Sequence, residues 1–340
     1  MNMISPEAVA SSKRAWIKIL ARYKKPDRRR SALELAITFF PFAAIWALTW
    51  AAYAYGYWWG LVLIIPAAGF LVRLFMIQHD CGHGSFFANR HADDWTGRVL
   101  GVLTLTPYDY WRRAHAVHHA SAGNLDQRGM GDIKTLTVGE YRALPLRRRI
   151  TYRLYRHPLV MFGIGPTWLF VFEQRLPVGM MKDGVTPWLS TMATNVAIAF
   201  AVAFTTWFVG LGAFLVVHLP IVILAGSIGI WLFYVQHQFE ETEWAREPDW
   251  EFQHAALYGS SYYDLPALLS WFTGNIGIHH VHHLSAKVPH YRLPEVLRDH
   301  PELKTIGRIT LIDSFRFVKL ALWDETRGKL VTFREAHAAG

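Results

Sequence analysis

Histidine side chains gather at a few points of this 340-residue chain. Imidazole nitrogen is a frequent ligand of iron, copper, zinc and nickel, so a dense histidine cluster is a candidate metal site. Eight of the 17 histidines fall in three tight clusters, and a metal-dependent reaction is therefore the first chemistry to consider. The clusters are His79 and His83; His115, His118 and His119; and His279, His282 and His283.

The spacing within the clusters constrains how many metals they hold. If the first cluster continues a helix, its i,i+4 spacing places both rings on one face. In the second cluster His115 lies one turn from both His118 and His119, but that adjacent pair diverges by about 100° around the axis. Two neighbouring metals can therefore share one cluster. Eight or nine imidazoles exceed the four ligands of a structural zinc, and the count favours two metals.

Several residues near the clusters have two possible roles. We predict His237 as a ninth ligand, because it stands where the fourth apolar run ends. The acids that follow it, Glu240, Glu241 and Glu243, can accept hydrogen bonds from imidazole N–H groups or form a solvated face. His280 occupies a spacer position and is predicted not to bind metal, but to lie near the site or in solvent.

Long apolar runs must position these clusters. The chain is 52% apolar and only 18% charged, against roughly 25% charged residues in a soluble domain. Four runs of about 22 residues match the ~30 Å hydrocarbon core of a bilayer. The alternative is a set of buried helices in a large soluble bundle, which two nearly all-apolar hairpins disfavour. The predicted spans are 33–55, 57–78, 188–209 and 211–235, paired in two hairpins with short turns near Gly56 and Gly210.

Basic residues predict the orientation of the spans. The two hairpin turns carry none of the 35 lysines and arginines, so the positive-inside rule places the remaining segments in the cytosol. These are the N-terminal segment 1–32, the insert 79–187 and the C-terminal segment 236–340, so every cluster is cytosolic. The predicted location is the bacterial inner membrane, with both termini cytosolic. The net charge of +9 then suits an anionic membrane surface rather than nucleic acid.

Some residues inside or beside the spans are expected to have structural roles. Glu34 and Arg73 lie near span ends, from which long side chains can reach the headgroups. His218 stands inside the fourth span and is predicted to be a satisfied polar residue within the helix bundle. Cys81 is the single cysteine, so no internal disulfide can form, and we predict that it is a small packed residue.

Further apolar stretches are too short to span a bilayer. The stretches 95–107 and 159–172 are expected to form interfacial or re-entrant segments. The stretches 95–110 and 262–272 are candidates for the lining of an acyl channel or for ordinary packing. The tail Thr310–Gly340 is expected to be peripheral. The sequence therefore predicts an all-α integral membrane protein, with four transmembrane helices in two hairpins and a cytosolic helical cap that holds the histidines.

The residues around the histidines carry a family resemblance over about three quarters of the chain. The matching segments are His79-Asp-Cys-Gly-His-Gly-Ser-Phe, Trp111-Arg-Arg-Ala-His-Ala-Val-His-His, Gly123-Asn-Leu-Asp, Gly131-Asp-Ile-Lys-Thr-Leu-Thr-Val-Gly-Glu-Tyr, Gln236-His-Gln-Phe-Glu-Glu-Thr-Glu-Trp, Gly277-Ile-His-His-Val-His-His-Leu and Pro289-His-Tyr-Arg-Leu-Pro. With these segments the chain resembles the membrane fatty acid desaturase family, and within it the acyl-lipid omega-6 (delta-12) branch.

The resemblance implies a di-iron centre that uses O2 and two electrons to remove two hydrogens from a fatty acyl chain. The implied substrate is an acyl group linked to a membrane lipid. The family's ligands fall on the eight clustered histidines, and His237 matches an extra histidine at a position where the family varies. A heme-binding His-Pro-Gly-Gly of a fused cytochrome b5 domain is absent, because His157-Pro-Leu-Val does not match it. The implied electron donor is a separate protein of the ferredoxin or cytochrome b5 type, which the basic cytosolic face suits.

Two alternatives remain open at the level of sequence. A membrane di-iron hydroxylase or ketolase of alkanes, sterols or carotenoids has similar histidine clusters, although Asp80-Cys-Gly-His and Gly123-Asn-Leu-Asp favour desaturation. A non-enzymatic metal transporter or metal-binding protein is also rich in histidine. Transport sites, however, usually lie near the bilayer midplane on broken helices, whereas these clusters are all at one face.

Overall fold

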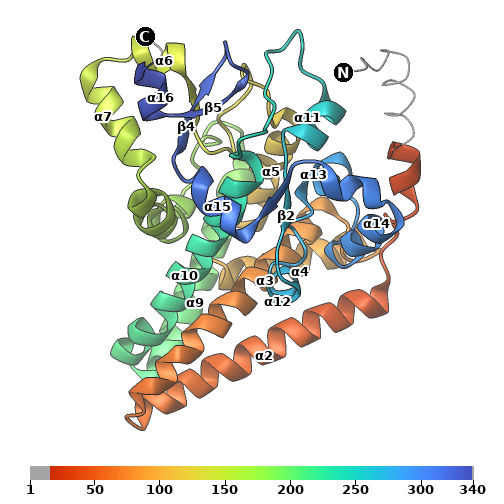
Figure 1. The fold of residues 1–340 in the computed structure, drawn as a ribbon. Helices are drawn as coiled ribbons and strands as arrows, with labels where there is room; N and C mark the ends of the chain where they lie inside the picture. The colour runs from red at the N-terminus through yellow and green to blue at the C-terminus, as the bar shows by residue number, and fades with distance from the viewer. Residues whose placement is uncertain (1–15, 339–340) are drawn as a thin grey trace.

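Four long helices dominate the computed structural model, which describes residues 16–338 (Figure 1). Each is long and apolar enough to cross a membrane, and they form the two predicted hairpins. The first hairpin joins α2 (Arg28–Ala54) to a continuous helical segment made of η1 (Trp58–Leu63) and α3 (Ile64–His83). The second joins α9 (Val185–Val209) to α10 (Leu211–His237). The predicted set of four membrane helices is therefore confirmed.

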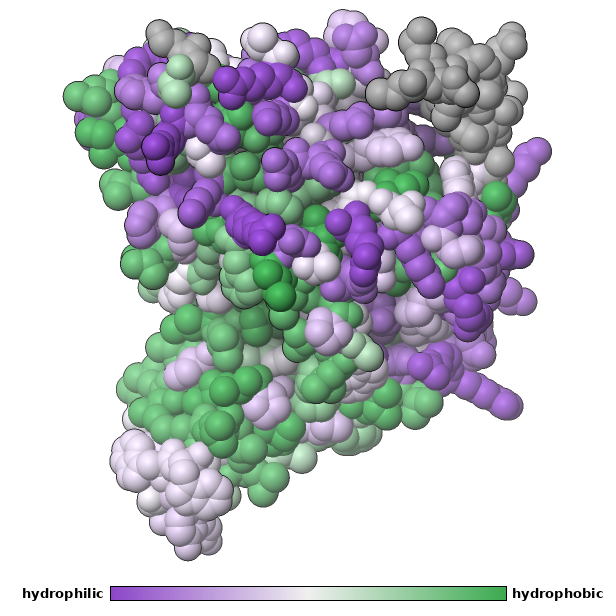
Figure 2. Space-filling model, in the orientation of Figure 1, coloured by the Kyte–Doolittle hydropathy of each residue, from purple (hydrophilic) through white to green (hydrophobic). Residues whose placement is uncertain are grey.

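The hairpin turns are as short as the sequence predicts. Gly56 and Gly210 have φ angles of 77° and 81°, which residues with a side chain rarely adopt. Figure 2 shows hydrophobic surface over the half of the molecule that contains the long helices, and mainly hydrophilic surface at the other end. Large aromatic side chains, Trp58 and Trp59 among them, are exposed next to the first turn, as in an aromatic belt at a membrane interface.

The two helices that follow the turns differ in burial. The second half of α3 is enclosed, with Leu74 and Ile77 fully buried, because α2, α4 and α10 pack around it. By contrast α9 exposes Phe200, Phe204 and Trp207 along its length. An apolar helix face without a protein partner is the surface expected to meet lipid. The site-bearing helix α3 is thus central, and α9 lies on the outside.

Arg73 and Glu34 do not reach toward headgroups, so the expectation of snorkelling is wrong. Both side chains are buried, with about 1% of each residue exposed, and they form an ion pair with each other. Arg73 also donates from Nε to Thr38 Oγ1 at 3.1 Å and lies over the Trp271 ring. The packing of α2 against α3 gives each charge a partner, which makes its burial tolerable where an isolated charge would be very costly.

We call the elements between α3 and α9, together with those after α10, the cap. Its first part contains helices α4 (Arg90–Leu103), α5 (Tyr108–Ser121), α6 (Val138–Ala143) and α7 (Leu146–Tyr155), followed by η2 (Val160–Ile164), α8 (Gly165–Thr167), η3 (Trp168–Phe172) and η4 (Glu173–Arg175). Its second part contains α11 (Phe252–Tyr258), α12 (Ala267–Phe272), α13 (His279–Leu284), η5 (His290–Arg292), α14 (Leu293–Asp299), η6 (Pro301–Thr305), α15 (Leu311–Phe317) and α16 (Phe333–Ala338). The mostly helical architecture is confirmed.

Two small sheets connect the parts of the cap. Strand β4 (Leu320–Asp324) lies between β1 (Leu136–Thr137), to which it is parallel, and β5 (Lys329–Thr332), to which it is antiparallel. Strand β2 (Tyr262–Asp264) pairs in parallel with β3 (Arg308–Thr310). The pairing of β1 with β4 joins segments about 185 residues apart in the sequence.

The C-terminal tail is more firmly packed than predicted. It contributes no ligand atom to the histidine groups described below, but Leu322, Trp323 and Val331 are buried in the cap. Phe317 O and Leu320 O also accept hydrogen bonds from the Tyr234 hydroxyl at the end of α10. Deleting 310–340 therefore exposes apolar surface and removes the partners of a buried hydroxyl, so the tail is a structural part of the cap.

Candidate metal centre

Four helices bring the clustered histidines to the junction between the long helices and the cap. Helix α3 continues past its apolar run to His83 and ends at Gly84, whose φ of 64° is the left-handed conformation that commonly stops a helix. His79 and His83 therefore share one helix face, as their spacing predicts. Helices α5 and α13 carry the other two clusters, and α10 ends at His237.

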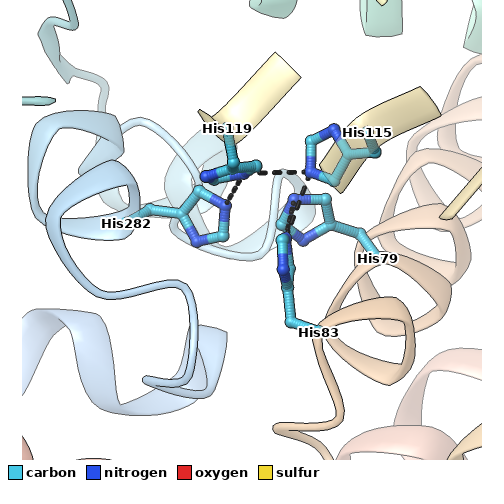
Figure 3. Close-up of side chains that lie close together, drawn as sticks. All are labelled: His79, His83, His115, His119 and His282. Carbon is cyan, nitrogen blue, oxygen red and sulfur yellow. Dashed lines mark hydrogen bonds between the residues drawn. The ribbon is translucent and has the colours of Figure 1, made fainter. Parts of the chain in front are cut away.

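Five histidines from three helices form what we call the first histidine group. Their ligand nitrogens all lie within 4.8 Å of one another. Figure 3 shows the five rings turned toward a common region, with consecutive Nε2 atoms 3.1–3.3 Å apart. The members are His79, His83, His115, His119 and His282.

Four further histidines form the second histidine group, and all four are buried. Its Nε2 atoms are again close: His118 and His237 are 3.2 Å apart, and His237 and His279 are 3.0 Å apart. His283 Nε2 lies 3.1 Å from His279 Nε2. His237, predicted from its position at the end of the fourth span, thus lies at the middle of this group.

The spacing of the nitrogens fits metal coordination. Two imidazole nitrogens bound to one ion at about 2.1 Å, at right angles to each other, are about 3.0 Å apart. Two outer ring nitrogens of the second group have acceptors: His118 Nδ1 lies 2.5 Å from Asp132 Oδ1, and His237 Nδ1 lies 3.2 Å from Gly259 O, whereas His279 Nδ1 has none. A proton held at Nδ1 leaves Nε2 with its lone pair free to bind a metal.

Burial favours the neutral form of these rings. The pKa values of His115, His119 and His282 are held well below 6.5, first by burial and then by the charge that neighbouring histidines would carry. The pKa values of His279 and His283 are lowered in the same way. Neutral imidazole is the form that binds metal, so the rings are ready as ligands at neutral pH.

The two groups divide the sequence clusters between them. From α5, His115 and His119 enter the first group and His118 enters the second, as the divergence of adjacent residues on a helix allows. Helix α13 contributes only His282 to the first group. His280 belongs to neither; it is buried, with Nε2 2.9 Å from Leu303 O, so it is a packed histidine beside the site and not a solvent-facing one.

Other predicted residues lie outside the groups. Glu240, Glu241 and Glu243 are exposed, and Glu243 accepts from His254 at 2.6 Å, so the solvated alternative describes them. His218 stacks on Phe214 within the bundle, but its Nδ1 has no hydrogen-bond partner, so the prediction of a satisfied side chain is wrong. The surrounding helix faces offer aromatic rings instead of acceptors. Cys81 is buried and free, as predicted.

Two acids beside the histidines were missed by the sequence analysis. Asp132 contacts His118, and Asp80 Oδ1 lies 3.5 Å from His79 Nδ1. Asp80 also accepts from the backbone and ring nitrogens of His290 at 2.7 and 2.8 Å. The signal for Asp80 was its position directly after a clustered histidine. Asp132 depends on how the loop after α5 folds back, which residue spacing alone does not reveal.

A cavity of about 290 Å³ adjoins the second histidine group. His118, His237 and Phe233 line it, and Arg128 and Lys134 are among its other lining residues. It is lined by neither of the stretches 95–110 and 262–272, which were considered for an acyl channel. A small molecule can therefore approach the second histidine group through this cavity.

Comparison with known proteins places this arrangement in a family. The family model described as "Fatty acid desaturase" matches residues 56–308, which include both histidine groups. The chain belongs to the fatty acid desaturase family. This desaturase is 42% identical over 333 residues to a "Fatty acid desaturase" of Bacillus subtilis, covering 97% of this chain and 94% of that protein.

More distant relatives have more specific names. The chain is 28% identical over 235 residues to the "sn-1 acyl-lipid omega-3 desaturase (ferredoxin)" of Synechocystis, covering 65% of this chain and 61% of the relative. It is 27% identical over 234 residues to the "sn-1 oleoyl-lipid 12-desaturase" of the same organism, covering 66% and 63%. The desaturase is thus similar to enzymes named for two different positions of attack.

Proposed function

We propose that this desaturase introduces a cis double bond at the delta-12 (omega-6) position of a lipid-linked fatty acyl chain, at a di-iron centre. The observation that carries the proposal is the convergence of nine imidazoles in two groups, on a chain of the fatty acid desaturase family. The proposed ligands are the five histidines of the first group and the four of the second.

The donor sets fit iron. Neutral imidazoles at coordination spacing suit this metal, and each group offers enough nitrogens for one ion. Iron bound there supplies the redox chemistry with O2 that breaking an unactivated C–H bond requires. In the overall reaction two hydrogens from the acyl chain, two electrons and two protons reduce one O2 to two water molecules.

The chain's own residues hold and orient this centre. Asp132 and Gly259 O fix the outer nitrogens of His118 and His237, so that the inner nitrogens point to the ion. Phe233 packs against His118, with ring centroids 4.9 Å apart, and gives the cavity an apolar wall. We infer that the acyl chain or O2 reaches the second group through this cavity.

The electron donor and the membrane topology belong to the same proposal. The donor is a separate protein of the ferredoxin or cytochrome b5 type, and the relative from Synechocystis named for ferredoxin supports the first. The cap and both termini face the cytosol, with the long helices in a bacterial inner membrane. The absence of lysine and arginine from both hairpin turns supports this orientation.

The test is a fatty acid profile of a host that lacks polyunsaturated lipids, with and without expression of the chain. We expect a new cis double bond at the delta-12 position of oleoyl lipids and about two irons per purified chain. A double bond at another position would overturn the delta-12 assignment. A hydroxylated or ketone product without unsaturation would overturn desaturation, and exchangeable zinc without O2-dependent turnover would overturn the di-iron centre.

A further inference from the structure

A second cavity, of about 370 Å³, lies in the cap where three segments far apart in the sequence meet. The end of α7, the connection from α15 to β4 and the junction of β5 with α16 form its walls. We call it the α7 pocket. Five of its lining residues are basic or histidine, and no carboxylate lines it: they are Arg153, Arg156, His157, Lys319 and Arg334.

The cations of the α7 pocket have no counter-ions within residues 16–338. Elsewhere in the cap many arginines are ion-paired, such as Arg246 with Asp126 and Glu325. No such pair is formed by the four cations of the pocket. The nearest acid in the sequence, Glu335, instead accepts from the Thr332 backbone N–H at 2.8 Å. Positive charge that the protein does not neutralise is available for an anionic ligand.

Among the cations of the pocket, Arg156 gives the strongest reason to expect an anionic ligand. Only 5% of this residue is exposed, and its side chain carries a guanidinium cation. It donates to neutral acceptors, Gln238 Oε1 at 3.0 Å and Leu320 O at 2.7 Å, while its buried Nε has no partner. A buried cation without an opposing charge is costly unless an anion approaches it.

The surroundings of the pocket indicate a lipid as the source of the anion. Helix α7 exposes Leu146, Ile150 and Leu154, which follow one another at intervals of four residues and so form one apolar stripe. Leu159, just beyond the helix, is 73% exposed. An exposed apolar stripe beside arginines is typical of a helix that lies in the membrane interface. Free phosphate would leave the stripe in water.

We propose that the α7 pocket binds the phosphate of an anionic phospholipid, whose acyl chains contact the exposed apolar residues at the end of α7 and just beyond it, Leu154 and Leu159. The proposal requires a membrane around the long helices but not the metal centre, so it can fail independently of the proposed reaction. Because Arg156 bonds Gln238, the residue that follows His237, the lipid would also stabilise the end of α10 that enters the second histidine group.

The test compares the thermal stability of the purified full chain in nanodiscs of phosphatidylcholine alone and in nanodiscs that also contain phosphatidylglycerol. We expect phosphatidylglycerol to raise the Tm by roughly 3–6 °C. The double variant Lys319→Ala with Arg334→Ala should lose at least half of this shift. Both side chains are exposed, so the variant should fold.

A matched variant controls for net charge. Arg298→Ala with Lys304→Ala removes the same two charges from exposed positions on α14 and η6, and it should keep the full shift. Equal shifts in both double variants would overturn the pocket. A shift of the same size from inorganic phosphate would overturn the lipid in favour of a free anion. Loss of binding to an acidic ferredoxin, with the lipid shift intact, would make the pocket a donor-docking site instead.

Discussion

The two histidine groups share helices α5 and α13, but the first is completed by α3 and the second by α10, and they differ in ligand number and access. The first has five nitrogens, and three of its five residues are partly exposed. The second has four, all buried, and adjoins a cavity of about 290 Å³. A six-coordinate ion would have one position left in the first group and two in the second. The better enclosed group is thus also the one with more room for a reactant.

The outer nitrogens extend this contrast. In the second group Asp132 and Gly259 O lie within hydrogen-bond distance of the outer nitrogens of His118 and His237. In the first group the Nδ1 of His79 has no hydrogen-bond partner, and Asp80 is 3.5 Å away. His279 Nδ1 of the second group also has no hydrogen-bond partner, so the second group is the more firmly oriented at His118 and His237 only.

Removing one ligand nitrogen from each group should impair the protein most. His118→Ala and His282→Ala should each lower desaturation at least 100-fold while membrane insertion is kept, because the proposed di-iron reaction needs both ions to be held. The measurement is double-bond formation in lipids, together with iron content per chain. We expect each variant to lose iron mainly from its own group.

The control for these variants is His91→Ala, which removes an exposed histidine of α4 outside both groups. It should leave activity within about twofold of the unmodified chain. Activity above a few percent in correctly inserted His118→Ala or His282→Ala would contradict a role for that nitrogen as a ligand. It would also contradict the requirement of both histidine groups for activity.

A smaller effect is expected from the residue that orients the second group. Asp132→Ala should reduce activity or iron affinity roughly 10- to 100-fold, as is typical when the hydrogen-bond partner of a ligand histidine is removed. Iron should be lost from the second group and kept in the first, which spectroscopy of the partly loaded protein can measure. Asp132→Asn should keep more activity and iron affinity than Asp132→Ala, because its amide oxygen can still accept a hydrogen bond from His118 Nδ1.

The matched control is Asp126→Ala, on the same loop but bonded to Arg246 and the Glu247 backbone N–H. It should leave iron content unchanged. If both aspartate variants lowered iron content equally, the loop as a whole would account for the effect, and not the Asp132 carboxylate beside His118. The hydrogen bond to His118 would then not explain the difference between the two groups.

The smallest expected effect concerns a property that the two groups share. In both, burial lowers the pKa of histidines such as His119 and His283 below the unfolded value of about 6.5. Between the lowered pKa of the folded chain and about 6.5, the unfolded chain binds more protons than the folded chain does. The free energy of unfolding of the metal-free protein therefore falls as the pH falls below about 6.5. After chelation the Tm should drop by several °C between pH 7.5 and 5.5. A constant Tm over this range would contradict neutral, buried rings.

The sequence analysis succeeded where the signal is local. Apolar runs of membrane length predicted all four long helices, and the spacing of histidines on a helix predicted that one cluster can serve two sites. It failed where the outcome depends on which distant segment packs alongside. Arg73 was expected at the headgroups because its partner Glu34 lies on another helix, 39 residues earlier. The parallel pairing of β1 with β4 is likewise invisible to any local pattern.

The order of the site-bearing helices along the chain has a consequence for biosynthesis. A ribosome that has completed α9 has already made four of the five nitrogens of the first group, since only His282 is still to come. At the same moment it has made one of the four of the second group, His118. If the groups bind iron as proposed, a nascent chain can bind its first ion before α10 is made, whereas the second ion has to wait until α10 and α13 have been made.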